Sequence, residues 1–127
     1  MLTATDAFRE AFPGAVVGAL AMGGVRNPAE SPPLEEAKRA LESELRAHEG
    51  LDGSPVLLAY ADYYRAFGKT FHVKGQWESV AVKGKPIPSR AALVEAMFMA
   101  ELRSLVLTAG HDLDAPERYL RAALEDD

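Results

Sequence analysis

Most hydrophobic positions in this chain recur every three or four residues, which is the spacing of an amphipathic helix. Capping residues, prolines in first turns and glycines after last turns then mark where the helices begin and end. We expect the fourth helix to be the longest and most central, because its apolar positions are too dense for one stripe. The pattern predicts five helices, bounded by Thr5 and Phe12, Ser31 and Gly50, Ser54 and Gly68, Ser89 and Gly110, and Asp114 and Leu124.

The second predicted helix separates apolar from charged positions. Leu41 and Leu45 belong to its inner stripe, whereas Lys38 and Glu42 belong to the opposite face. We expect that face to be solvated and stabilised by pairs of opposite charge one turn apart. His48 follows in the last turn, where a cation suits the helix dipole. No second ligand lies at metal-binding spacing from His48, so a structural role is the favoured interpretation.

Two segments depart from helical spacing. Ala15–Met22 is a short, uncharged, apolar run between turn signals and is predicted to be a buried strand. Residues 69–88 are ambiguous, because Phe71 and Val73 alternate as in a strand, whereas 76–83 also fits a short helix that ends at a glycine. The predicted fold class is therefore α+β, predominantly helical with a small β component.

Length and composition narrow the class of protein. A chain of 127 residues is long enough for one domain with its own core, so residues 1–127 are expected to form a single domain. Hydrophobic residues make up 48% and charged residues 26%, which excludes a wholly disordered chain. No apolar run reaches the length of a membrane span, and the absence of cysteine excludes a disulfide framework. We therefore expect a cytoplasmic protein that does not bind membranes.

The charge is unevenly distributed along the chain. The net charge of −5 divides into −5 over residues 1–64, +5 over residues 65–90 and −5 over residues 91–127. Six of the ten aromatic side chains fall in or just before this basic island, residues 65–90. In the third predicted helix, Phe67 is expected on the inner face and Tyr63 at its rim. Cations that bind phosphates and rings that stack on bases are what a single-stranded nucleic acid needs. The alternative interpretation is that the rings are core and the lysines solvate a loop.

One pair of residues suggests hydrolytic chemistry. His72 and Glu78 are an imidazole and a carboxylate among lysines, and together they could orient a water for attack on an ester. Lys83 or Lys85 would then offset the developing negative charge. The alternative interpretation is a salt bridge between Glu78 and a lysine.

A second cluster of polar residues follows the fourth predicted helix. His111, Asp112 and Asp114 could ligate a cation, but a turn and a helix cap explain two of the three. We therefore predict no metal and no cofactor.

Several longer motifs resemble the B3/B4 domain family. This family includes the tRNA-binding and editing domain in the β subunit of phenylalanyl-tRNA synthetase and free-standing B3/B4 proteins. The resemblance covers residues from about 12 to 114. The motifs that carry it are Phe12–Met22, Tyr63–Val73, Gln76–Ser79, Lys83–Pro88, Ala92–Leu102 and Leu107–Asp114.

The resemblance implies a function in RNA binding. In the synthetase, this α/β module accommodates the 3′ end of tRNA and hydrolyses wrongly attached tyrosine. The chain is thus expected to bind tRNA or aminoacyl-tRNA, with trans-acting deacylation by His72 and Glu78 as an extension. The resemblance also implies that residues 78–80 are helical. The residues expected to contact RNA are Lys69, Lys74, Lys83, Lys85 and Arg90 at phosphates, and Phe71 and Trp77 at bases.

The chain departs from the family pattern at its C-terminal end. Family members continue with a β-rich second half, whereas residues 115–127 here are predicted to form a short, charged, capped helix. The predicted strand Ala15–Met22 would then pair with a local strand, be covered by helices, or pair across a homodimer. The alternative function is a non-catalytic scaffold, truncated or engineered, that keeps the helical core and self-associates.

Overall fold

The computed structural model describes residues 3–112, which form five α-helices and no strand. Helices account for 52% of these residues, so the α+β prediction is wrong and this part of the chain is purely helical. The fifth predicted helix lies outside the described residues. The helices are α1 (Asp6–Ala11), α2 (Pro32–Ala47), α3 (Pro55–Ala66), α4 (His72–Ala81) and α5 (Ala92–Ser104).

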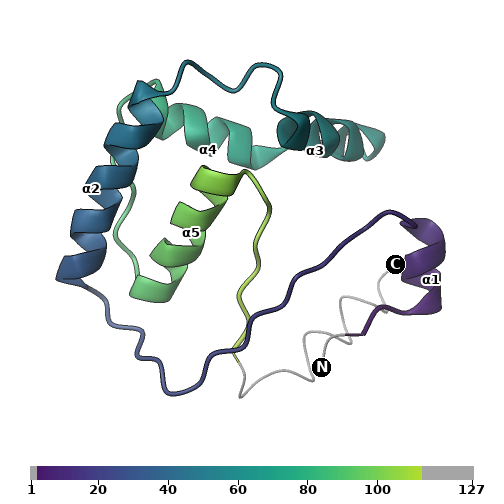
Figure 1. Cartoon of the computed structure of the whole chain (residues 1–127), viewed down its shortest axis with the longest axis horizontal. Coiled ribbons are helices and arrows are strands. Elements are labelled where there is room, and N and C mark those ends of the chain that lie inside the picture. Colours follow the sequence, from purple (N-terminus) through teal and green to yellow (C-terminus); the bar gives the residue numbers. More distant parts are fainter. Residues whose placement is uncertain (1–2, 113–127) are drawn as a thin grey trace.

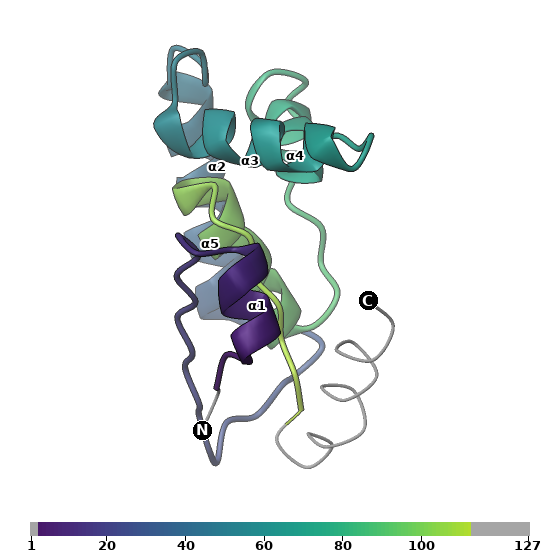
Figure 2. The ribbon, with the colours of Figure 1, turned by 90° about the vertical axis from the view of Figure 1, so that its right-hand side faces the viewer.

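Three of these helices form the body of the molecule. α5 lies beside α2, and α4 crosses one end of both, as Figure 1 shows. α3 projects beyond α4, and α1 lies apart from the body (Figures 1 and 2). The buried apolar side chains come mainly from the body and its loops, and they are Leu41, Leu45, Leu57, Phe71, Val73, Trp77, Val80, Ile87, Leu102 and Leu105.

The predicted strand Ala15–Met22 is not a strand. Its chain is extended, but within the described residues no backbone N–H or C=O of residues 16–26 makes a hydrogen bond. Its side chains are exposed, including Val16 at 96% and Leu20 at 84%. We call residues 15–26 the arm. Figure 1 shows the chain leaving α1 and passing beneath the body to reach α2.

The ambiguous segment 69–88 is a helix followed by a loop. The helical alternative is correct, and α4 includes residues 78–80, as the resemblance implied. Arg46 stabilises the end of this helix, since its guanidinium donates to the Val80 carbonyl at 3.4 Å and to the Gly84 carbonyl at 3.2 Å. α4 ends at Ala81, and Gly84, three residues further on, has φ of 68°, a conformation that glycine adopts without a Cβ penalty.

The predictions for α5 need three corrections. α5 has 13 residues and α2 has 16, so α5 is not the longest helix. It begins at Ala92 rather than after Ser89, and its first N–H groups are bound from outside: the Leu93 N–H donates to Asn27 Oδ1 at 2.9 Å and the Ala92 N–H to the Pro28 carbonyl at 2.9 Å. It ends well before Gly110, because Leu105 takes a left-handed conformation with φ of 61°. None of the helices described is long and apolar enough to cross a membrane.

Candidate nucleic-acid interface

The basic island holds six cations, of which Arg65 on α3 is paired with Asp62 at 2.8 Å, and the other five are exposed along α4 and its flanking loops. Lys69 lies in the turn between α3 and α4, Lys74 on α4, Lys83 and Lys85 in the loop after α4, and Arg90 just before α5. Lys74 lies 3.9 Å from a Glu78 oxygen. The other four make no ion pair with any described residue. Their charges are therefore not neutralised within this part of the protein.

Hydrogen bonds and one buried side chain hold the backbone of the loop after α4 in place. The Ile87 side chain is buried in the core, and its N–H donates to Glu42 Oε1 at 2.7 Å. The Arg90 N–H donates to Glu95 Oε1 at 2.6 Å. The Lys85 N–H donates to the Ser79 carbonyl at 2.9 Å. Since the loop is fixed at several points, its cations extend into solvent from a defined backbone.

The two rings expected to stack on bases lie in the core. Phe71 is buried and stacks on Tyr60, with ring centroids 4.3 Å apart and an interplanar angle of 13°. Trp77 is buried beneath His48, whose ring meets it edge-on at 6.0 Å. Neither ring presents a free face, so the structure places both among the packing residues of the island rather than on its surface.

A different pair of rings is exposed at the N-terminal end of the island, with Phe67 inside it and Tyr63 just before it. Tyr63 and Phe67 on and after α3 are 47% and 58% exposed, with centroids 5.2 Å apart. Phe67 therefore does not lie on the inner face predicted for it, whereas Tyr63 is at the rim as predicted. Phe12, at the end of α1, contacts Tyr63 at 5.8 Å. The four-residue spacing of the two rings, next to Lys69, is the signal that identifies them in the sequence.

The structure does not bring His72 and Glu78 together. Both lie on α4, where six residues separate them. That spacing corresponds to about 9 Å along the helix axis and about 120° around it. His72 packs edge-on against Tyr64 at 6.3 Å, and Glu78 faces Lys74 instead. The two side chains thus point to different sides of the helix.

A buried lysine links α2 to the start of α5. Lys38 is fully buried, and its ammonium group has an acceptor for each of its three protons: Glu35, Glu95 at 2.8 Å, and Ser89 Oγ at 3.0 Å. Glu42 is buried on the same face. The prediction of a solvated face at Lys38 and Glu42 is therefore wrong, because acceptors and donors from distant segments satisfy these charges inside.

This cluster shifts the pKa values of its members. The hydrogen bond from Lys38 lowers the pKa of Glu35 below its ordinary value of 4.5. Glu95 has a lowered pKa for the same reason, and the Arg90 N–H adds to the effect. Burial alone would lower the pKa of Lys38, but the bonds to both glutamates outweigh it and raise that pKa above 10.5. All three groups are thus charged at neutral pH.

Buried glutamates also change what the net charge means for an anionic partner. Glu42, Glu95 and Glu101 are buried, and each accepts a backbone N–H from a loop. With the buried cation Lys38, these three negative charges make a net charge of −2 inside the molecule that is not spread over its surface. The whole-chain charge of −5 therefore overstates how acidic the surface of the described residues is.

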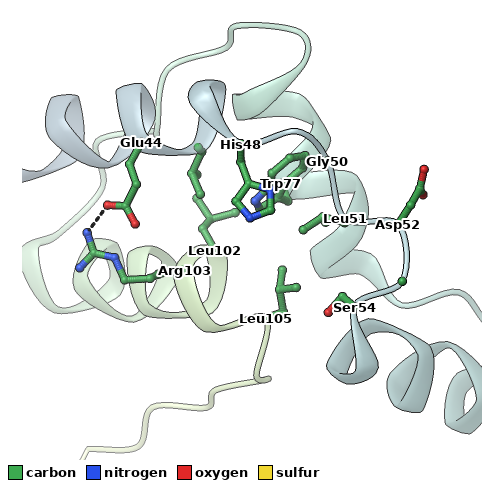
Figure 3. Close-up of a pocket in the computed structure, with 12 residues that line it drawn as sticks. Glu44, His48, Gly50, Leu51, Asp52, Ser54, Trp77, Leu102, Arg103 and Leu105 are labelled. Carbon is green, nitrogen blue, oxygen red and sulfur yellow. Dashed lines mark hydrogen bonds and ion pairs between the residues drawn. The ribbon is translucent and has the colours of Figure 1, made fainter.

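Figure 3 shows a hollow at the junction of α2, α4 and α5. Its volume is about 360 Å³, and its walls include Leu45, Leu51, Trp77 and other apolar side chains. On its rim, Arg103 donates to Glu44 at 2.8 Å, so its cation is already paired. The lining offers no free cation to a phosphate, which separates this hollow from the basic island.

The polar cluster His111, Asp112 and Asp114, for which the sequence predicted no metal, lies only partly within the described residues. His111 and Asp112 are exposed, and Asp114 lies outside the described residues. Among residues 3–112, no group of three or more His, Asp or Glu side chains is arranged to hold a metal ion.

Comparison with known proteins adds no assignment to this geometry. The chain matches no family model, no curated protein and no solved structure. The resemblance to the B3/B4 family therefore stays a prediction from the motifs.

Proposed function

We propose that this protein is an RNA-binding module that contacts its ligand through the basic island, with tRNA as the expected partner. The observation that supports the proposal most directly is the exposure of four cations that lack an ion-pair partner among the described residues, namely Lys69, Lys83, Lys85 and Arg90. Cations in this state release counterions from a phosphate backbone when they bind it. The proposal places this binding in the cytoplasm, since the chain has no cysteine.

The exposed rings of Tyr63 and Phe67 supply the base contacts in this proposal. Aromatic side chains beside a basic surface are the usual means by which proteins bind single-stranded nucleic acid without strong sequence preference. Lys69 follows Phe67 by two residues, so one phosphate contact and one stacking contact would lie close together along the RNA. Phe71 and Trp77 stabilise the core under this surface and do not contact bases in the proposal.

The proposal covers binding and not hydrolysis. An ester hydrolase needs its base and its positioning groups around one water, and His72 and Glu78 lie on different sides of α4. The scaffold alternative differs in its prediction, because a protein that retains only packing residues would not bind RNA even at low salt.

The test is a titration of the protein into fluorescently labelled tRNA at low and at near-physiological salt. We expect binding that weakens steeply with salt. The Lys83→Glu/Lys85→Glu variant should bind more weakly, and its salt slope should fall by about 1.4, the value for two phosphate contacts on a single strand. An unchanged affinity and slope, or no binding by the wild type at either salt, would overturn the proposal.

A matched control separates the island from general charge. The Arg9→Glu/Arg103→Glu variant changes the net charge by the same amount, but these exposed residues lie on α1 and α5. It should keep more affinity than the lysine variant. Equal losses in the two variants would mean that RNA responds to net charge and not to this surface.

A second variant tests the stacking contact. Phe67→Ser should weaken tRNA binding about tenfold with no change in salt slope, because stacking contributes about 1–3 kcal/mol per base and involves no phosphate. Val94→Ser, at an exposed apolar position on α5, is the control and should bind as the wild type does.

A further inference from the structure

The first helix, α1, meets the rest of the protein through an aromatic contact. The ring of Phe12, the residue that ends α1, lies 5.8 Å from the ring of Tyr63 on α3, at an interplanar angle of 57°. Phe8 packs beside Phe12 at 5.4 Å. No side chain of α1 is buried, and among the described residues no hydrogen bond or ion pair joins residues 3–12 to another helix. The position of α1 therefore depends on the contact between rings.

The chain that joins α1 to the body does not hold this helix in place. Its first anchor on the body is Asn27, whose side chain accepts the Leu93 N–H at 2.9 Å. Before that point, no backbone group of residues 16–26 is hydrogen-bonded within the described chain, and residues 13–26 are exposed. Residues 14, 18, 23 and 24 are glycines, which have the widest backbone freedom. The chain can therefore follow α1 away from α3 without losing a hydrogen bond of the arm.

Phe12 contacts a ring that the proposed function assigns to RNA. The Tyr63 ring also contacts Tyr64 and Phe67, but both of these belong to α3 or its C-terminal end. Within the described residues, Phe12 is the one ring that reaches Tyr63 from another segment. An aromatic ring against Tyr63 occupies surface that a flat base would use in stacking. Phe12 is thus an internal competitor of an RNA base.

The strengths of the two contacts favour displacement of Phe12. A contact between two aromatic side chains favours the associated state by about 2 to 13 times. Stacking of a base on an aromatic side chain favours binding by about 5 to 150 times. Charge acts in the same direction, because residues 3–12 carry Asp6, Arg9 and Glu10, a net charge of −1 that phosphates repel. α1 is therefore expected to leave when RNA binds and not to close over it.

We propose that α1 is a lid that covers part of Tyr63 in the free protein and is displaced when RNA binds. The proposal rests on the proposed function, in which Tyr63 stacks on a base. The lid lowers the affinity for RNA, because the full surface of Tyr63 is available only in the fraction of molecules whose α1 is displaced. A helix of six residues is unstable by itself, so α1 should also lose its own hydrogen bonds when it leaves α3.

Titration of labelled tRNA with variants of Phe12 tests the lid. Phe12→Ser should bind about three- to tenfold more tightly than the wild type at an unchanged salt slope, because it frees Tyr63 and removes no cation. Phe12→Tyr keeps a ring and should bind as the wild type does. Val17→Ser, at an exposed position of the arm, is the matched control and should also bind as the wild type does. Unchanged or weaker binding by Phe12→Ser would overturn the lid.

A double variant places the effect at Tyr63. Tyr63→Ser should weaken tRNA binding, since it removes a stacking ring. Phe12→Ser/Tyr63→Ser should bind no more tightly than Tyr63→Ser, because the surface that the lid covers is gone. A gain from Phe12→Ser that persists in the Tyr63→Ser background would contradict the proposal. Phe12 is not part of the hydrophobic core, so thermal unfolding of Phe12→Ser should match that of the wild type.

Hydrogen exchange follows the lid directly, with and without RNA. The Phe12 N–H donates to the Phe8 carbonyl at 2.9 Å and the Arg9 N–H to the Thr5 carbonyl at 3.1 Å. Without RNA, protection of these two amides should be lower in Phe12→Ser than in the wild type, and equal protection would show that the ring contact does not hold α1. In the wild type, tRNA should lower this protection. Higher protection with tRNA would mean that α1 closes over the RNA, which overturns the lid.

These measurements separate failure of the lid from failure of RNA binding. If neither the wild type nor Phe12→Ser binds tRNA at low salt, the proposed function and the lid are both overturned. If both bind tRNA with the same affinity, the lid alone is overturned and the basic island remains the RNA surface.

Discussion

The body and the arm differ in what holds their irregular backbone. In the body, loop N–H groups find buried acceptors: the N–H groups of Ile87, Arg90 and Thr108 donate to Glu42, Glu95 and Glu101, respectively. In the arm, no N–H of residues 16–26 has a described acceptor. The loops of the body are therefore fixed by buried carboxylates, one from the distant helix α2 and two from the neighbouring helix α5, whereas residues 16–26 have no such support among the described residues.

The difference does not come from hydrophobicity. Residues 105–107 are as apolar as residues 16–17, and both stretches are extended or irregular. Yet the Val106 N–H donates to Ser104 Oγ at 3.1 Å and the Leu107 N–H to the Tyr60 hydroxyl at 3.1 Å. Two stretches of similar local sequence thus differ in whether their backbone N–H groups are hydrogen-bonded, because polar side chains lie beside only one of them.

The largest effect should come from matched leucine truncations in the two regions. Leu102→Ala removes a fully buried side chain and should lower the free energy of unfolding by about 3–4 kcal/mol. Leu20→Ala changes an exposed side chain and should stay within about 0.5 kcal/mol. Urea unfolding followed by circular dichroism, at concentrations where the protein is monomeric, measures both. Equal losses would remove the distinction between body and arm.

The next effect concerns the buried ion cluster. Lys38→Met leaves buried and half-buried carboxylates without their cation, and it should lower the free energy of unfolding by about 3 kcal/mol. Lys74→Met, at a half-exposed lysine on α4, should change it by less than about 0.5 kcal/mol. Adding Glu95→Gln to Lys38→Met should restore part of the loss, because the unpaired charge is removed. A double variant less stable than Lys38→Met would argue against this account.

A smaller effect is expected where the chain from the arm meets the body. Asn27→Ala removes the side-chain acceptor of the Leu93 N–H and should cost about 1 kcal/mol, as loss of a helix cap does. Asn27→Asp keeps an acceptor and should be close to the wild type. Hydrogen exchange at the Leu93 amide measures the change locally, and unaltered protection in Asn27→Ala would contradict a capping role.

The smallest effect should appear in the dependence of stability on pH. Glu35 and Glu95 have lowered pKa values in the folded state, so their contribution is present above pH 4.5 and is lost as pH falls through the folded values. Lys38 has a raised pKa, so its contribution is present below pH 10.5 and is lost as pH rises past the folded value. Urea midpoints should therefore be highest between these limits.

The control for this pH profile is Glu95→Gln, which removes one of the shifted carboxylates. Between neutral and acidic pH, its urea midpoint should fall less than that of the wild type. A Leu20→Ala profile should follow the wild type, because the arm holds no shifted group. A Glu95→Gln profile as steep as the wild type would exclude Glu95 as a source of the acid dependence.

Much of the fold could be predicted from local signals. Thr5 and Ser54 accept N–H groups from α1 and α3, as their capping positions predicted. Gly68 has φ of 64°, as expected for a residue that ends a helix. Segment 69–88 is ambiguous in the sequence because alternation and helical spacing coincide over so short a run. Exposure of the basic island was predictable too, since unpaired lysines rarely leave water.

The candidate site was less predictable, because it depends on which rings are buried. Phe71, Trp77 and Phe67 are all aromatic residues near lysines, and the sequence alone does not rank them. Phe71 is buried because Tyr60 stacks on it, and Trp77 because it packs between helices. Phe67 remains exposed because it follows the last turn of α3, which projects beyond the body.

The sequence by itself determined that α1, α2 and α3 form, that Thr5 and Ser54 cap two of them, and where the basic island lies along the chain, since these depend on neighbours within a few residues. It did not determine the ends of α5, and Ser31 makes no side-chain capping bond at the start of α2. The tertiary structure decided where Lys38 and Glu42 lie and that the arm is unpaired. Lys38 is buried because Ser89 and Glu95, more than fifty residues further along the chain, supply its acceptors. No described segment supplies partners to the arm, so an apolar pattern that predicted a strand has no sheet to join. Whether a polar or apolar group is inside depends on satisfied bonds, which only distant segments can provide.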